Sequence, residues 1–140
     1  MFPLNAVAPL NALPMFVTLA TFQEFKSWLS QIKRDHYDSS HVCWAYALHR
    51  EQSIDYHCSD GGEPSGTAGK PILSTIKTNN LIQTGVIVVR YFGGVKLGVG
   101  GLINAYRSAA QDALLNIAFE KRYIKEVFVV HTLLKENGIS

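Results

Sequence analysis

The feature that most constrains the fold is a run of β-branched residues that leads into a glycine-rich loop. Residues 84–92, TGVIVVRYF, form a continuous apolar run, which predicts a strand buried on both faces near the centre of a sheet. Residues 93–101, GGVKLGVGG, contain five glycines. Apolar positions then recur at helical spacing over residues 102–119. The chain therefore contains a strand, a glycine loop and a helix in succession, and the strand is expected to be central in its sheet.

The N-terminal half predicts a strand followed by an amphipathic helix. Residues 15–20 are rich in β-formers. Residues 21–36 carry apolar side chains at helical spacing, and Thr21 with Glu24 forms a potential capping box at their start. The aromatic stripe of this helix is expected to enter the core.

Two neighbouring segments predict a β-hairpin. Residues 41–48 and 53–58 both alternate, and a short polar connection separates them. In the first segment, one face carries the larger side chains of Val42, Trp44 and Tyr46. The other face carries the small side chains of Cys43, Ala45 and Ala47. A short helix is expected from about Pro71, and residues 123–134 predict one more strand.

Composition limits the class of protein. A chain of 140 residues with 47% apolar residues fits one globular domain, and its net charge of +2 is no argument for nucleic-acid binding. Cys43 and Cys58 match no zinc or disulfide pattern, so two reduced thiols in a cytoplasmic protein are expected. Three prolines interrupt the apolar start, which argues against a signal peptide or a membrane span.

The first glycine-rich segment, residues 57–71, brings acids close to hydroxyls and a lysine. Asp60 and Glu63 could bind a metal or act as acid and base, with Lys70 nearby. No zinc spacing or nucleophile elbow accompanies them. We therefore favour acids that cap backbone N–H groups, and we expect no metal and no cofactor.

The second glycine-rich loop is flanked by cations. Arg90, Lys96 and Arg107 surround it together with Tyr91, and Lys70 joins them if the two loops meet. Such a surface suits a phosphate backbone, whereas the alternative is a solvated rim in which the cations pair with the loop acids. The loop matches neither the Walker nor the dinucleotide pattern. The candidate loop glycines are Gly62, Gly66, Gly69, Gly93, Gly94, Gly98, Gly100 and Gly101.

Together, the segments SDGGEPSGTAGKPIL and VVRYFGGVKLGVGGLINAY resemble the paired signatures of the IMPACT family, which includes YigZ-type bacterial proteins. The resemblance runs from about residue 15 to residue 117. It implies an α+β, two-layer sandwich: a sheet of about four strands with two main helices on one face. This is the β-α-β fold also found in a small-subunit ribosomal protein and in domain IV of elongation factor G.

The sequence departs from the family pattern in three places. Gly61 stands where the family has a second acid, which weakens any two-carboxylate scheme, and a basic segment usual at the first strand is replaced by NALPMFVTLA. YigZ-type members also continue into a second domain. The resemblance therefore divides the chain into an extension over residues 1–14, the family domain over 15–122 and a remnant of a second domain over 123–140.

Three functions remain open at this stage. The resemblance implies a regulator of translation or of a stress response that binds RNA, the ribosome or a translation-regulatory protein. The candidate contacts are Asp60, Glu63, Lys70, Arg90, Tyr91, Lys96 and Arg107. The alternatives are a small-molecule hydrolase that uses the acidic loop, and a protein-interaction module whose C-terminal strand pairs two copies. Binding without catalysis is favoured over an enzyme.

Overall fold

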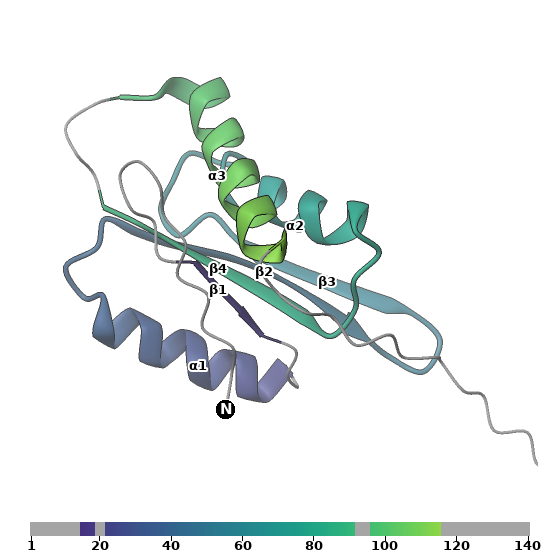
Figure 1. Cartoon of the computed structure of the whole chain (residues 1–140). Coiled ribbons are helices and arrows are strands. Elements are labelled where there is room, and N and C mark those ends of the chain that lie inside the picture. Colours follow the sequence, from purple (N-terminus) through teal and green to yellow (C-terminus); the bar gives the residue numbers. More distant parts are fainter. Residues whose placement is uncertain (1–14, 19–21, 92–95, 116–140) are drawn as a thin grey trace, which may run out of the picture.

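The computed structural model describes residues 15–18, 22–91 and 96–115. These residues form a four-stranded antiparallel sheet in the order β1-β4-β2-β3, together with three helices (Figure 1). In chain order the elements are β1 (Met15–Thr18), α1 (Phe22–Asp35), β2 (His41–His49), β3 (Ile54–Ser59), α2 (Gly69–Thr78), β4 (Thr84–Arg90) and α3 (Gly98–Leu115). None of the described helices is long and apolar enough to cross a bilayer.

Strand β4 is an inner strand, as its apolar run predicts. It pairs with β1 on one side and with β2 on the other, so that Val88 lies opposite both Met15 and Cys43. Six consecutive residues of β4 are buried, from Thr84 to Val89. The predicted hairpin is also confirmed, because β2 and β3 pair antiparallel.

Helices cover both faces of this sheet. Helix α1 packs Phe25, Leu29 and Ile32 against one face, where Tyr46 and Ile87 lie. Helices α2 and α3 cover the opposite face, which carries the small side chains of β2 (Figure 1). The α+β class and the four-stranded sheet are confirmed, and two helices do share one face. The arrangement differs from a two-layer sandwich because β2 and β4 are apolar on both sides, so α1 forms a third layer.

Two helices begin earlier than their sequence patterns indicate. Helix α2 starts at Gly69, two residues before Pro71, and α3 starts at Gly98 within the glycine loop. For α2 the cause is Asp60, whose carboxylate accepts hydrogen bonds from the N–H groups of Ala68 and Gly69 at the start of the helix. The expected N-cap Thr21 and the expected strand over residues 123–134 lie outside the described residues.

Candidate functional site

The strands that lead into the two glycine-rich segments, β3 and β4, finish at the same end of the sheet (Figure 1). Strand β2 begins at this end and β4 finishes there, so that His41 lies opposite Arg90. Strand β3 also ends there, at Ser59, and leads into the first loop. The two glycine-rich segments therefore follow strands that finish at the same end of the sheet, β3 and β4.

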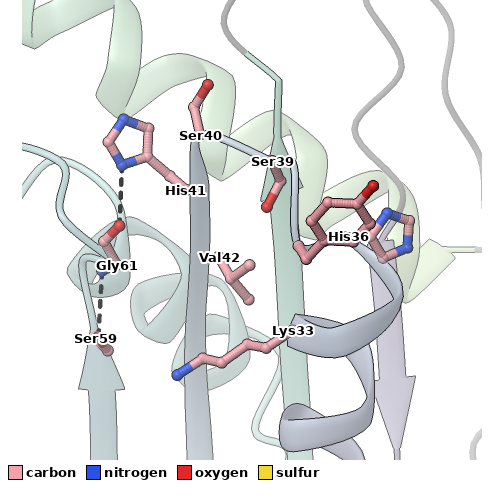
Figure 2. A pocket seen from close by; sticks show the side chains of 9 residues that line it. Lys33, His36, Ser39, Ser40, His41, Val42, Ser59 and Gly61 are labelled. Atoms are coloured by element: carbon pink, nitrogen blue, oxygen red, sulfur yellow. Dashed lines mark hydrogen bonds between the residues drawn. The ribbon is translucent and has the colours of Figure 1, made fainter.

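The first loop is held against β2 through Gly61. Its N–H donates to Oγ of Ser59 at 3.2 Å, and its carbonyl lies 2.9 Å from Nδ1 of His41 (Figure 2). A carbonyl oxygen only accepts, so Nδ1 carries the proton. Gly61 has a φ of +55°, and a Cβ built there would lie 2.2 Å from the carbonyl oxygen of Val42. The glycine that replaces the family's second acid thus fills a position with no room for a side chain.

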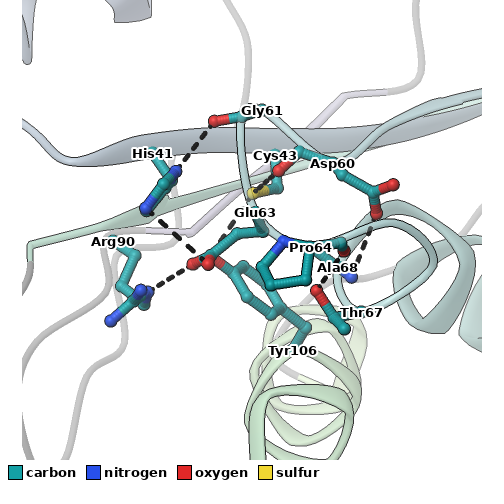
Figure 3. Close-up of polar contacts among 10 residues, drawn as sticks. All are labelled: His41, Cys43, Asp60, Gly61, Glu63, Pro64, Thr67, Ala68, Arg90 and Tyr106. Carbon is teal, nitrogen blue, oxygen red and sulfur yellow. Dashed lines mark hydrogen bonds and ion pairs between the residues drawn. The ribbon is translucent and has the colours of Figure 1, made fainter. Parts of the chain in front are cut away.

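Asp60 caps helix α2 from a distance in sequence. Its Oδ1 accepts from the N–H groups of Ala68 at 3.1 Å and Gly69 at 2.8 Å, and Oδ2 accepts from Gly66 at 3.0 Å (Figure 3). Burial alone would raise the pKa of Asp60, but these donors and nearby Lys70 outweigh it, and the pKa is lowered. The capping role expected of the loop acids is confirmed for Asp60.

Glu63 occupies a buried position, with 3% of its side chain exposed. Its Oε1 accepts from Nε of Arg90 at 2.5 Å and from the hydroxyl of Tyr106 at 2.6 Å, and His41 Nε2 lies 3.7 Å from Oε2 (Figure 3). Burial would raise the pKa of Glu63, yet the hydrogen bonds from Arg90 and Tyr106 outweigh it, and the pKa is lowered. This carboxylate joins the first loop to β4, α3 and β2.

A thiol extends the cluster on its buried side. Cys43 Sγ lies 3.0 Å from the carbonyl oxygen of Asp60 and 3.3 Å from the hydroxyl of Tyr106. Burial raises the pKa of Cys43 to about 12. The thiol therefore remains a weak donor rather than a nucleophile.

Both loop acids are engaged by groups of the chain itself. Asp60 is occupied by three backbone donors, and Glu63 is buried against Arg90 and Tyr106. Among the described residues, no group of three or more His, Cys, Asp or Glu side chains could hold a metal ion. Among the described residues, both loop acids therefore make structural contacts within the chain.

The candidate residues separate into an inner and an outer set. Arg90 belongs with Asp60 and Glu63, because only 12% of its side chain is exposed. Lys70, Lys96 and Arg107 are exposed, and none of them forms an ion pair with a described residue. The rim alternative, in which the cations pair with the loop acids, therefore holds for Arg90 alone among these four.

Tyr91 lies beyond the end of β4 with 38% of its surface exposed. Its hydroxyl lies 2.6 Å from Nδ1 of His36 and donates to Asp38 at 3.4 Å. These contacts fix an exposed aromatic ring beside the loops.

The loop glycines do not share one role. Gly62 and Gly66 have positive φ values, whereas a Cβ at Gly69 would meet the backbone of Ser59 at 2.9 Å. The last glycines of the second loop form the first turn of α3: Gly98, Gly100 and Gly101. Gly93 and Gly94 lie outside the described residues.

Two members of the buried cluster were not identified from sequence as site residues. Tyr106 is part of the apolar stripe of α3, which indicates only a core position. His41 suggests only a metal ligand, for which no partner spacing exists. The available signal was one polar group on each side chain: the hydroxyl of Tyr106 within α3, and the imidazole of His41 at the first residue of β2.

Comparisons with known proteins agree over the described domain. A family model for the Impact N-terminal domain matches residues 14–114. The chain is 40% identical over 114 residues to the IMPACT family member YvyE of Bacillus subtilis, which covers 81% of this chain and 51% of that protein. It is 35% identical over 98 residues to the IMPACT family member YigZ of Escherichia coli, covering 69% and 48% respectively.

A solved structure supports the same fold. It is described as the crystal structure of a hypothetical protein, with a TM-score of 0.68 and 32% identity over 74% of this chain and 52% of that one. The chain thus spans about half the length of the relatives that it matches.

Proposed function

Because this chain belongs to the IMPACT family, we propose that it is a cytoplasmic, translation-linked module that binds RNA, free or in the ribosome, at the loop end of its sheet. The observation that carries the proposal is the Glu63 cluster. It fixes the first loop to β4 and α3, the elements on either side of the second loop, which supports a common binding surface there. We call the set Lys70, Tyr91 and Lys96 the loop surface.

The charge of the loop surface supports RNA as the ligand. Lys70 and Lys96 form no ion pair with a described residue, so binding a phosphate would not require breaking one. Proteins commonly contact RNA through lysines on phosphates and through aromatic rings stacked on unpaired bases. Tyr91 supplies such a ring, and exposed Leu97 and Val99 add apolar contact beside Lys96. The overall charge of +2 would contribute little to the attraction of RNA, so these local cations must supply most of it.

A salt series tests the proposal. Single-stranded RNA binding is measured by fluorescence anisotropy for the wild type and for Lys70→Ala/Lys96→Ala. Each phosphate contact contributes about 0.7 to the slope of log K against log salt for single strands, so the double variant should lower the slope by about 1.4. The matched control is Lys26→Ala/Lys77→Ala, which removes the same charge from residues that lie over Phe22 and Tyr56.

The control double variant should bind as the wild type does. Equal losses in both double variants, or no RNA binding at low salt, would contradict an RNA surface. The link to translation is tested separately, by co-sedimentation of the chain with ribosomes at low and at moderate salt. Ribosome association that persists in Lys70→Ala/Lys96→Ala would instead indicate a translation-regulatory protein as the partner.

A further inference from the structure

Strand β3 lies at the edge of the sheet, because it pairs with β2 on one side and no described strand pairs with its other side (Figure 1). Natural proteins commonly protect an edge strand with a proline or with a charge such as lysine. Strand β3 contains neither residue, and its acid Asp55 is paired with Arg50. Within the described part of the chain, β3 therefore presents an unprotected edge.

The hairpin turn shows which backbone groups of β3 face β2. The N–H of Arg50 donates to the carbonyl of Ser53 at 2.8 Å, so these two residues form a hydrogen-bonded pair. At the next pair His49 lies opposite Ile54, but the N–H of His49 donates to Oε1 of Gln83 at 2.7 Å, just before β4. Because hydrogen-bonded and non-hydrogen-bonded pairs alternate along an antiparallel ladder, this turn fixes the bonding pattern of the whole strand.

The outer edge of β3 is formed by three alternate residues. The alternation leaves the N–H and C=O groups of Ile54, Tyr56 and Cys58 pointing away from β2. Tyr56 lies opposite Ala47, which packs in the core with α2, so the three side chains lie on the α2 face of the sheet. All three residues are exposed. An added strand would therefore meet backbone groups and side chains of the same three residues.

Two lysines of α2 lie beside this edge. Lys77 Nζ is 4.1 Å from the centre of the Tyr56 ring. Lys70 comes seven residues earlier, so it lies on the same face of the helix, about 10 Å away along the helix axis. Burial raises the pKa of the Cys58 thiol, and both lysines oppose this shift from nearby. Neither lysine forms an ion pair with a described residue, so the α2 side of the edge carries free positive charge.

The charge at this edge favours one kind of partner. Asp60, the acid that also acts on the Cys58 thiol, has its carboxylate occupied by three backbone N–H groups. A second copy of β3 would bring a second pair of lysines to the same edge, and like charges across a ladder destabilise pairing. An extended segment with carboxylates on alternate residues would instead present opposite charge, because alternate side chains of a strand lie on one face.

We propose that the outer edge of β3 binds an extended acidic segment of a partner protein, which joins the sheet as an added strand. The outward backbone groups of β3 hydrogen-bond to this segment, and its acidic side chains lie beside Lys70 and Lys77. Strand addition gains affinity from main-chain hydrogen bonds and specificity from alternate side chains. The interaction goes beyond RNA binding and does not depend on it, since it shares only Lys70 with the loop surface.

The first experiment follows amide hydrogen exchange of the full chain by NMR, with acetyl-Thr-Glu-Val-Glu-Val-Glu-Thr-amide as the probe. In the free chain the amides of Tyr56 and Cys58 should exchange fast, whereas the amide of His57 between them is protected by its bond to β2. Saturating peptide should slow exchange at Tyr56 and Cys58 at least about tenfold and leave His57 unchanged. The proposal is overturned if peptide at about 1 mM slows neither amide.

The free chain supplies two further outcomes that separate other occupants of the edge. Slow exchange at Tyr56 and Cys58 in a dilute sample without peptide would mean that the chain covers its own edge. Protection that grows with protein concentration would mean that a second copy binds there. Either result would overturn the proposal of an acidic partner.

Lys77→Ala tests the contribution of charge. Its Kd for the acidic peptide should rise about two- to fivefold, the range typical of one exposed ion pair. The matched control is Lys26→Ala, whose ammonium lies over the ring of Phe22 on α1, and it should leave the Kd unchanged. A probe with glutamine in place of glutamate should bind the wild type more weakly and should not distinguish it from Lys77→Ala. If Lys77→Ala and Lys26→Ala bind the acidic probe alike, the acidic character of the partner is wrong.

Two further probes test the backbone pairing, one N-methylated at its glutamates and one at its valines. The N–H groups of alternate residues point to opposite sides of a strand, so only one of the two sets can face β3. One probe should therefore lose binding, and the other should retain it. Equal binding of both probes would show a contact through side chains alone and would overturn strand addition.

Discussion

The two acids of the first loop are three residues apart, yet they hold the molecule together in different ways. Asp60 binds three backbone N–H groups, all within nine residues of it. Glu63 binds side chains 27 and 43 residues away, on β4 and α3. Asp60 therefore shapes one loop and one helix end, whereas Glu63 fixes the two signature segments to each other. The same residue class in one loop carries a local role and a long-range role.

The largest expected effect is that of Glu63→Ala. Removing the carboxylate takes the ion-pair acceptor away from the largely buried guanidinium of Arg90, and breaking a buried ion pair typically costs about 3–5 kcal/mol. The free energy of unfolding, measured by urea denaturation, should fall by about that amount. Glu51→Ala is the matched control, because Glu51 is exposed, and it should change stability by less than about 0.5 kcal/mol. Similar losses of unfolding free energy in the two variants would contradict a long-range stabilising role of Glu63.

A second, smaller effect is expected between the two acids, at Gly61. Alanine there would combine a positive φ with a Cβ only 2.2 Å from a backbone oxygen, which should destabilise the fold by about 1–3 kcal/mol. Gly98 has a φ of +71° but no atom within 4 Å of its Cβ position. Gly98→Ala therefore measures the backbone cost alone. If urea denaturation gives equal losses for both, the contact between Gly61 and Val42 has no energetic weight.

Asp60→Ala should cost less than Glu63→Ala, because it removes a cap rather than a buried ion-pair partner. Loss of a capping side chain costs about 0.5–2 kcal/mol. The effect should also be local: hydrogen exchange should accelerate at the amides of Gly66, Ala68 and Gly69. Asp60→Asn, which keeps one acceptor oxygen, should restore part of this protection. Uniform acceleration over the whole sheet would contradict the local role.

The sequence predicts those parts of this molecule that depend on short-range patterns. The central strand, the β2–β3 hairpin and the two faces of β2 follow from periods of two and from β-branched residues. The face of the sheet that α1 covers does not follow, because helical periodicity shows which side of a helix is apolar and not where that helix docks. The sequence shows small residues on one face of β2 and aromatic residues on the other. This difference does not indicate which helix packs on which face.

In the candidate site, too, the short-range contacts follow from the sequence and the long-range contacts do not. Capping by Asp60 is predictable, since an acid among glycines shortly before a helix has nearby N–H groups to bind. The partners of Glu63 are not, because the contact with Tyr106 depends on how α3 lies against the loop, 43 residues away. Tyr106 carries its hydroxyl at the end of an otherwise apolar side chain, so the helical pattern alone assigns it to the core. Long-range polar pairs thus need the docked elements before they can be identified.

The smallest effect expected for either acid is that of protonation, because a neutral carboxyl keeps part of its hydrogen bonding. The pKa values of Asp60 and Glu63 are both lowered from their ordinary values of 3.8 and 4.5. A lowered folded-state pKa adds stability above the ordinary value, and that stability is lost as the pH falls toward the folded-state pKa. The contribution of these two carboxylates to the free energy of unfolding should therefore be fully present above about pH 6 and should decrease as the pH falls below about 5.

Glu63→Gln assigns this acid sensitivity to one side chain. The variant has no carboxyl to protonate at position 63, so its urea midpoint should fall less steeply between about pH 5 and pH 3 than that of the wild type. The remaining slope contains the contribution of Asp60, which the same series on Asp60→Asn should remove. An unchanged slope in Glu63→Gln would mean that its carboxylate is as stable in the unfolded chain as beside Arg90 and Tyr106. In that case the contact of the first loop with β4 and α3 would be held by packing and not by charge.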